Sequence, residues 1–146
     1  MSKRAAIALG CKCDVCPLQD AEGPVLPERH AGAQIALVGD APSDRDVKEG
    51  RPFVGPAGNL LMKGVKQAGL RRNDIHWTNV LMCRPPDGDL QRILEVTRRK
   101  NRQIEKVNKE RLKDAKSEGV NPDDVPLVPT IPTPMQCCAP RLDREM

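Results

Sequence analysis

"IALVGDAPSDRDVKEGRPFVGPAGNLL" (residues 35–61) joins an apolar run to a turn-rich, carboxylate-dense stretch and then to a helical pattern. The apolar run predicts a short buried strand at Ile35–Val38, because it is brief and is followed at once by glycine and proline. We expect a long loop after it, through Gly55. Pro56 suits the first turn of a helix whose apolar residues recur at helical spacing until Gly69.

A second strand is predicted in "DIHWTNVLMCRPP" (residues 74–86), which is rich in β-forming residues and ends in two prolines. The order strand, loop, helix, strand is typical of two parallel strands joined by a right-handed crossover. Ligands of open parallel sheets bind at the carboxyl ends of the strands. Polar residues follow both strands, at 39–46 and 79–84, so we expect an α/β fold with its site at this edge.

The basic residues are concentrated in one later segment. Residues 89–117 lack Gly and Pro, which predicts a long amphipathic helix capped by Asp89, either continuous or broken near Asn101. Between Leu90 and Glu118 the sequence has ten Lys and Arg residues and five Asp and Glu residues. This excess suits a polyanion, and a helix kept soluble by its charge is the alternative interpretation. A proline-rich linker, expected to be extended, follows at 119–134.

The composition predicts a small aliphatic core. Of 146 residues, 38% are hydrophobic, and Phe53 and Trp77 are the only aromatic residues, so one domain is expected. No stretch approaches the roughly 20 apolar residues that a membrane span needs, and the first apolar segment is too short for a signal peptide. We therefore expect a cytoplasmic protein with no membrane partner.

Six cysteines in a reducing compartment are expected to be ligands or free thiols rather than disulfides. Five of them lie in a C-x-x-C, at the end of the second predicted strand and near the C-terminus: Cys13, Cys16, Cys83, Cys137 and Cys138. All-thiolate ligation fits a structural zinc ion or a [4Fe–4S] cluster, and spacing alone does not separate the two. His30 and His76 add no obvious ligand.

Four segments together resemble the family 4 uracil-DNA glycosylases, the iron–sulfur branch of the uracil-DNA glycosylase superfamily. "CDVCPL" (13–18) is similar to the family's N-terminal C-x-x-C-x-L, and "TNVLMCRPP" (78–86) to its T-N-V-x-x-C-R-P-P. "LVGDAPSDRDVKEGRPFVGPAGNLL" (37–61) resembles its V-G-E-A-P-G, acidic run and G-R-P-F-V-G-x-A-G-x-L-L without a gap. "PTPMQCCAPRL" (132–142) is similar to the segment with the fourth cluster cysteine.

The resemblance implies a ligand set and a base-binding pocket. It implies a [4Fe–4S] cluster on Cys13, Cys16, Cys83 and Cys138. Zinc stays the alternative metal, and Cys11 and Cys137 are expected to be spare thiols unless Cys137 replaces Cys138. It implies that Phe53 stacks on a flipped uracil and Asn79 bonds its edge, and that the pocket is lined by Gly39, Ala41, Pro42 and Ser43. Asp40 and Asp46 match the family's acids and would act in catalysis.

These residue types suit the chemistry of base removal. Hydrolysis of an N-glycosidic bond requires an extracted base, a grip on that base, and negative charge near an oxocarbenium-like sugar. Simpler interpretations stand beside this one: Phe53 as core, Asn79 paired with backbone, and the acids Asp44, Asp46 and Glu49 as solvated turn residues.

The sequence departs from the family in three respects. The motif's Glu and second Gly are Asp40 and Ser43, and 54 residues separate Cys83 from Cys138 where the family has a short loop. The C-terminal H-P-S or H-P-A motif is absent, together with the later strands. We therefore expect one domain (1–146) with an incomplete parallel-sheet α/β/α fold, in which residues 88–131 are an inserted basic helix and linker that adds phosphate contacts.

Three functions follow as hypotheses. The first is a DNA repair glycosylase that flips uracil from single- or double-stranded DNA and hydrolyses its glycosidic bond, completed by a missing segment or a second chain. The second is a truncated or split homologue that acts as a non-catalytic iron–sulfur DNA-binding module. The third is a zinc-stabilised interaction module unrelated to bases.

Overall fold

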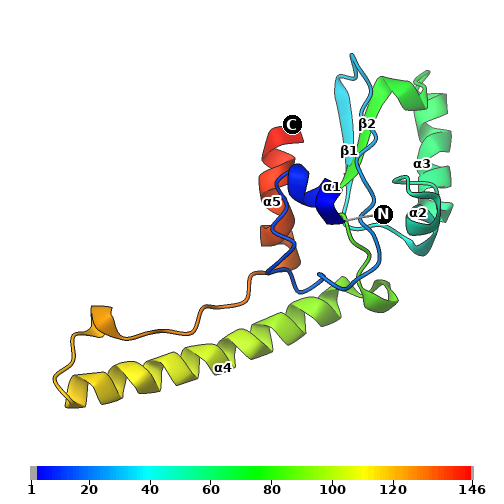
Figure 1. The fold of residues 1–146 in the computed structure, drawn as a ribbon. Helices are drawn as coiled ribbons and strands as arrows, with labels where there is room; N and C mark the ends of the chain where they lie inside the picture. The colour runs from blue at the N-terminus through cyan, green and yellow to red at the C-terminus, as the bar shows by residue number, and fades with distance from the viewer. Residues whose placement is uncertain (1–2, 146) are drawn as a thin grey trace.

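The computed structural model describes residues 3–145, in which helices surround a two-stranded parallel sheet (Figure 1). Strand β1 (Ile35–Gly39) pairs with β2 (Ile75–Asn79) in a register that places Ile35 opposite Ile75 and Gly39 opposite Asn79. Helix α3 (Pro56–Gln67) lies between them in the chain and begins with Pro56 in its first turn. The predicted parallel strand–helix–strand unit is confirmed.

Four further helices complete the described chain. They are α1 (Lys3–Ala8), α2 (Asp44–Glu49), α4 (Leu90–Ser117) and α5 (Pro134–Glu145), with 3₁₀ turns at Arg72–Asp74, Pro86–Gly88 and Pro122–Asp124. The prediction of α4 is confirmed, including its cap, because the Asp89 side chain accepts a hydrogen bond from the Arg92 backbone N–H at 3.0 Å. Sequence analysis did not anticipate α1, α2 or α5.

The prediction of a long loop through Gly55 is wrong, because α2 forms inside it. Ser43 is the N-cap: its hydroxyl accepts a hydrogen bond from the Asp46 N–H at 3.3 Å, while the Asp46 carboxylate accepts one from the Ser43 N–H at 2.8 Å. This reciprocal capping box satisfies two amide groups that a helix start leaves without partners. Gly50 ends the helix in the left-handed conformation, with φ of 68°.

Both strands differ in detail from the prediction. The prediction that β1 is buried is wrong, because Ile35 and Val38 are 42% and 44% exposed. Strand β2 is shorter than residues 74–86, because the chain turns after Asn79. The turn stays attached to the sheet, since the N–H groups of Val80 and Leu81 donate to the carbonyls of Gly39 and Asp40 at 2.6 and 2.9 Å.

Two apolar clusters lie around the sheet. One joins Ile75 and Trp77 of β2 to Val65 of α3, with Leu37, Phe53, Leu61, Met62 and Leu70 packed against them. The other contains Leu81 and Met82, which follow β2, with Ala6 of α1 and Cys137 and Cys138 of α5. Figure 1 shows α2 and α3 to one side of the strands and α1 and α5 to the other. The α/β/α layering expected from the resemblance is therefore present around a small sheet.

Helix α4 and the chain that follows it project away from the sheet as a separate arm (Figure 1). The helix is continuous through Asn101, and the following chain is extended as predicted except at the 3₁₀ turn of Pro122–Asp124. Asn101 exchanges two hydrogen bonds with the Ile131 backbone at 2.8 and 2.9 Å, and Asn108 exchanges two with Val128 at 2.9 Å each. Two side-chain amides thus hold the returning chain against α4. No helix among residues 3–145 is both long and apolar enough to cross a membrane.

Candidate functional site

A cavity of about 290 Å³ opens at the carboxyl ends of β1 and β2. The predicted site residues among its lining are Gly39, Asp40, Ala41, Ser43, Asp46, Phe53 and Asn79. Gly55, Pro56, Ala57 and Gly58 complete that lining, which sequence analysis did not assign although the motif around Phe53 contains them. Pro42 lies outside this cavity and lines a neighbouring one.

Phe53 has a backbone conformation that the surrounding glycines make possible. Its φ is 57°, in the left-handed region that a non-glycine residue rarely adopts. A Cβ at Gly58 would lie 2.0 Å from the Phe53 carbonyl oxygen, and a Cβ at Gly39 would lie 2.8 Å from the Phe53 ring. The same Cβ at Gly39 would lie 2.4 Å from Oδ1 of Asn79. The ring and the amide therefore meet above a strand end that has room only for glycine.

The Phe53 ring is supported from behind. It packs on Trp77 with ring centroids 5.5 Å apart, and the Arg72 guanidinium lies 4.7 Å from the centroid of Trp77. Arg72 in turn donates to both oxygens of Glu28, at 2.9 and 2.8 Å, and to the carbonyl of Pro52 at 2.7 Å. These contacts hold the backbone just before Phe53, and they also hold the Trp77 ring on which Phe53 packs.

The two predicted catalytic acids have different environments. The Asp46 carboxylate is buried and accepts hydrogen bonds from the Ser43 N–H, the Ser43 hydroxyl and the Val54 N–H at 2.7 to 2.8 Å. Asp40 is exposed, and within residues 3–145 its carboxylate has no hydrogen-bond or ion-pair partner. Asp46 thus shapes the segment that carries Phe53, while the Asp40 carboxylate is available to a ligand in the cavity.

Arg141 was missed by sequence analysis, which used its neighbourhood only to place a cysteine. Its side chain is fully buried and comes from α5. It donates to the Thr78 hydroxyl at 2.9 Å, to the Val80 carbonyl at 3.0 Å and to the carbonyl of Asn79. Arg141 therefore fixes the backbone from which the Asn79 side chain enters the cavity. The signal was the "APRL" that follows Cys138.

A second cavity, of about 530 Å³, adjoins the first and shares Asp40, Ala41 and Ser43 with it. Pro42, Asp44, Arg84 and Pro85 line it, together with Gly88, Asp89, Leu90 and Gln91 at the start of α4. The linings of the two cavities together extend from Phe53 to the first turn of α4. Neither histidine lines either cavity.

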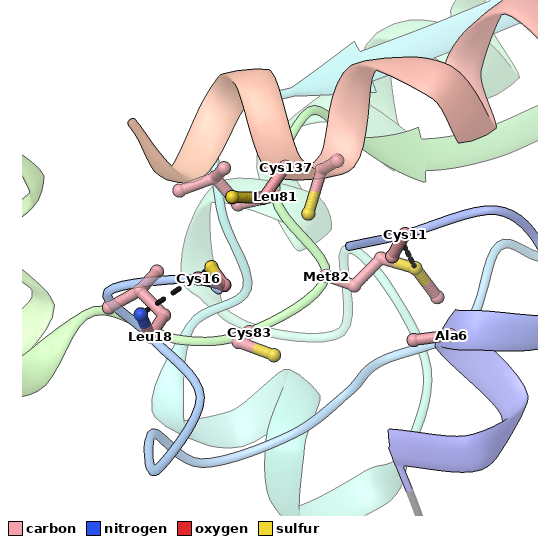
Figure 2. Packing of buried hydrophobic residues seen from close by; sticks show 9 residues of the cluster. Ala6, Cys11, Cys16, Leu18, Leu81, Met82, Cys83 and Cys137 are labelled. Atoms are coloured by element: carbon pink, nitrogen blue, oxygen red, sulfur yellow. Dashed lines mark hydrogen bonds between the residues drawn. The ribbon is translucent and has the colours of Figure 1, made fainter. Parts of the chain in front are cut away.

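All six cysteines line one small cavity of about 10 Å³ between the N-terminal loop, the turn after β2 and α5. Figure 2 shows Cys16, Cys83 and Cys137 approaching one another from these three segments, with Cys11 beside Met82. Cys11, predicted to be a spare thiol, is buried, and its sulfur lies 3.5 Å from that of Met82. Cysteine side chains from three segments far apart in the sequence thus line one cavity.

The thiols of this cavity influence one another. Burial raises the pKa of Cys83 to about 11, with further contributions from the thiols of Cys138, Cys13 and Cys16 and an opposing one from Lys3. Burial likewise raises the pKa of Cys137 to about 12. A hydrogen bond from Cys11 lowers the pKa of Cys138. Cys138 therefore interacts with each of the other three predicted ligands.

The donor set suits thiolate ligation in its chemistry. Cys residues alone surround the cavity as ligating groups, and Lys3, whose ammonium donates to the Leu18 carbonyl at 2.8 Å, favours negative charge on these sulfurs. Within the described residues, no three His, Cys, Asp or Glu side chains are placed to hold a metal ion. The sulfurs are gathered but do not converge on a single point.

The sequence profile of the uracil DNA glycosylase superfamily matches residues 27–146, which include both strands, the lining of the 290 Å³ cavity and α5. The chain belongs to the uracil-DNA glycosylase superfamily. The match includes the site residues from Gly39 to Asn79 and the C-terminal cysteines, and it begins after the C-x-x-C.

Several relatives in the superfamily are similar over part of this chain. A type-4 uracil-DNA glycosylase of Thermotoga maritima is 42% identical over 77 residues, 52% of this chain and 40% of that protein. Those of Saccharolobus solfataricus and Archaeoglobus fulgidus are 38% and 46% identical, over 66% and 51% of this chain and 47% and 38% of their own lengths. The chain thus matches less than half the length of these relatives.

Proposed function

We propose that this protein is a DNA repair uracil-DNA glycosylase that extracts uracil from DNA and hydrolyses its N-glycosidic bond. The observation that carries the proposal is the meeting of Phe53, Asn79 and Asp40 around the 290 Å³ cavity, which we call the base-end cavity. An aromatic ring, an amide and an unengaged carboxylate are the groups needed to stack on a base, bond its edge and act at its sugar. The relatives named type-4 uracil-DNA glycosylase support the same activity.

Each of the three groups has a distinct task in the proposed reaction. The flipped base stacks on Phe53, whose ring Trp77 supports, and the Asn79 amide bonds the base edge. As the bond from C1′ to the base nitrogen breaks, its electron pair leaves with uracil and the sugar develops positive charge. The Asp40 carboxylate stabilises that charge and orients the water whose oxygen bonds to C1′, and a water proton passes to solvent.

Asp46 serves the same reaction by holding Phe53 in place. Its carboxylate accepts hydrogen bonds from both ends of the segment, at Ser43 and Val54. A buried carboxylate satisfied by three donors has little capacity left for substrate. Asp40 is therefore the catalytic carboxylate of this proposal and Asp46 a positioning residue.

We further propose that Cys13, Cys16, Cys83 and Cys138 hold a [4Fe–4S] cluster that ties the N-terminal loop and α5 to the sheet. The fourth ligand is Cys138 in this proposal because the "APRL" of the family's segment follows it, and its thiol influences those of Cys13, Cys16 and Cys83. Cys137, whose thiol is hydrogen-bonded to Cys16, is the alternative. A thiolate-bound zinc ion would supply the same structural link. Iron and sulfide analysis with visible absorbance tests the cluster, and stoichiometric zinc in colourless protein would contradict it.

The activity is tested on single-stranded uracil DNA and on U:G duplex DNA. We expect abasic product from the wild-type protein and a loss of about 10² to 10⁴ in single-turnover rate for Asp40→Asn. Glu49→Gln is the matched control, because Glu49 is an exposed carboxylate in the same segment that lies outside both cavities. An equal effect of both substitutions would contradict the role of Asp40.

A non-catalytic DNA-binding module is the second candidate. The observation that favours it is that the lining of the base-end cavity contains no histidine, whereas the family pattern places one beside the base. DNA binding without abasic product at any concentration of cluster-loaded protein would establish this second function. It would also indicate that another segment or chain is needed for hydrolysis.

A further inference from the structure

Helix α4 has two contrasting faces. The face toward the returning chain carries its least exposed side chains, which recur at intervals of three and four residues: Leu94, Thr97, Asn101, Ile104, Asn108, Leu112 and Ala115. The Asn101 and Asn108 amides fasten that face to the extended chain. The core of the arm is therefore closed by residues of the chain itself.

A line of cations occupies a different face of the same helix. Its residues also recur at alternating intervals of three and four, and all are exposed: Arg99, Arg102, Lys106, Lys109, Lys113 and Lys116. We call these six residues the basic stripe. At about 1.5 Å per residue the stripe extends for about 25 Å, and at 100° per residue it points well away from the returning chain.

The charges of the stripe are largely uncompensated. Within residues 3–145, none of its six side chains forms an ion pair, whereas Arg92 at the start of α4 pairs with Asp87. Glu95 precedes the stripe on its own face, and Glu105 and Glu110 flank it. Arg98, Arg99 and Arg102, with Glu95 and Val96, also line a hollow of about 370 Å³ on α4, in which three cations outnumber one carboxylate. Guanidinium groups at such spacing can engage phosphate oxygens in pairs.

The stripe follows the proposed base site along the chain and begins on the helix whose first turn lines the neighbouring cavity. The first turn of α4 lines the 530 Å³ cavity with Arg84, and that cavity shares Asp40, Ala41 and Ser43 with the base-end cavity. From Leu90 to Arg99 the helix rises about 13 Å. A polyanion with one nucleotide in the base-end cavity can therefore extend past the first turn of α4 to the stripe, with Glu95 as the acid on that face between them.

We propose that the basic stripe of α4 is a second DNA-binding surface, which contacts the phosphates that flank the nucleotide held at Phe53. The proposal rests on the proposed function in taking DNA as the polyanion. A linear array of cations matches the regular charge of a nucleic acid backbone. A membrane-binding helix instead needs an apolar face to insert, and on α4 the returning chain covers that face.

The test compares two triple variants, each lacking three positive charges. The stripe variant is Arg102→Gln, Lys106→Gln, Lys109→Gln. The control variant is Lys63→Gln, Lys66→Gln, Lys100→Gln, which alters exposed residues of α3 and the opposite side of α4. Affinity for a fluorescent uracil-containing duplex is measured from 50 to 200 mM salt. Unchanged circular dichroism in both variants shows that the arm still folds.

On duplex DNA each phosphate contact contributes about 0.9 to the magnitude of the slope of log affinity against log salt. The slope of the stripe variant is therefore expected to be smaller than that of the wild type by up to about 3, and the slope of the control variant to be smaller by less than about 1. Equal slopes for wild type and the stripe variant would overturn the proposal. A stripe variant that binds duplex DNA as the wild type does, and that loses only its binding to acidic vesicles or to RNA, would also overturn it.

The same titration on undamaged duplex separates this inference from the proposed function. Phosphate contacts do not require uracil, so stripe-dependent binding is expected on undamaged DNA as well. If that binding persists while uracil excision is absent, the second surface stands and the proposed activity fails. If excision proceeds and the stripe variant keeps the wild-type slope, the activity stands and the second surface fails.

Discussion

Glycine at position 39 allows the two base-binding side chains to meet at the strand end. Any Cβ there would lie 2.4 Å from Oδ1 of Asn79 and 2.8 Å from the Phe53 ring, both below a normal contact. We expect Gly39→Ala to displace the ring or the amide and to lower the single-turnover rate of uracil excision at least tenfold. The melting temperature is expected to fall as well, because overpacking costs about 1 to 3 kcal/mol.

Gly64→Ala is the matched control for this substitution. Gly64 lies inside α3, and a Cβ there would have no atom within 4 Å. Alanine in a helix interior is favoured over glycine by about 0.5 to 1 kcal/mol, so this variant is expected to keep its rate and to melt at the same or a higher temperature. A Gly39→Ala protein as active as Gly64→Ala would show that the cavity is not where the base binds.

At the level of elements, Glu28 joins three segments of the molecule. Its backbone pairs with Trp77 of β2, and its carboxylate accepts hydrogen bonds from Arg51 after α2 and Arg72 before β2. Burial alone would raise the pKa of Glu28, but the hydrogen bonds from Arg72, Arg51 and His30 outweigh it and lower the pKa to about 2.

This lowered pKa predicts a pH-dependent contribution to stability. The ordinary pKa of Glu is 4.5 and the folded value is about 2, so the contribution is full above pH 4.5 and is lost as the pH falls toward 2. It amounts to at most about 3 kcal/mol, less the screening at exposed Arg51. We expect Glu28→Gln to lower the free energy of unfolding at pH 7 and to flatten its decline below pH 4.5, as measured by urea titration.

Glu110→Gln is the control for that measurement, because Glu110 is exposed on α4 and forms no ion pair within the described residues. Glu110→Gln is expected to leave unchanged both the free energy of unfolding at pH 7 and its decline below pH 4.5. If the free energy of unfolding of Glu28→Gln declines below pH 4.5 as steeply as that of the wild type, the pH dependence belongs to other carboxylates.

The elements differ in how well sequence could predict them. The helices α3 and α4 have long periodic patterns and local caps, so Pro56 and Asp89 marked their starts correctly. The helix α2 was missed because it is only six residues long, is rich in charge and lies between Pro42 and Gly50, although Ser43 followed by Asp46 is a capping box. The exposure of β1 could not be predicted, because burial depends on which other segments reach it.

The candidate site was predictable where it depended on a contiguous motif. Asp40, Phe53 and Asn79 were named from two segments at strand ends, and the parallel pairing brings those ends together. The support of Phe53 by Arg72 and Glu28 and of Asn79 by Arg141 depends on contacts between residues 20 to 62 positions apart. No local pattern announces such contacts.

At the scale of the whole molecule, the cysteine cavity joins α5 to the N-terminal loop and to the turn after β2, although the arm separates α5 from them in the sequence. Both Cys137 and Cys138 line it, and Cys137 is hydrogen-bonded to Cys16, but Cys138 influences the Cys83 thiol and precedes the "APRL" that resembles the family's segment. We therefore expect Cys138→Ser to lose the iron and visible absorbance of the proposed cluster, whereas Cys137→Ser retains both. A cluster that forms equally well without Cys138 would assign the fourth ligand to Cys137.

Loss of the cluster should also loosen the molecule at one defined place. Arg141, one turn beyond Cys138, holds the backbone of Asn79 and Val80, so freeing α5 removes the support of the base-end cavity. We expect Cys138→Ser, and wild-type protein stripped of iron, to show faster amide exchange in α5 and at residues 78–81. Residues 101–131 of the arm should exchange as before, because the Asn101 and Asn108 amides hold the arm independently. Faster exchange throughout the chain would instead mean that the cluster supports the whole fold.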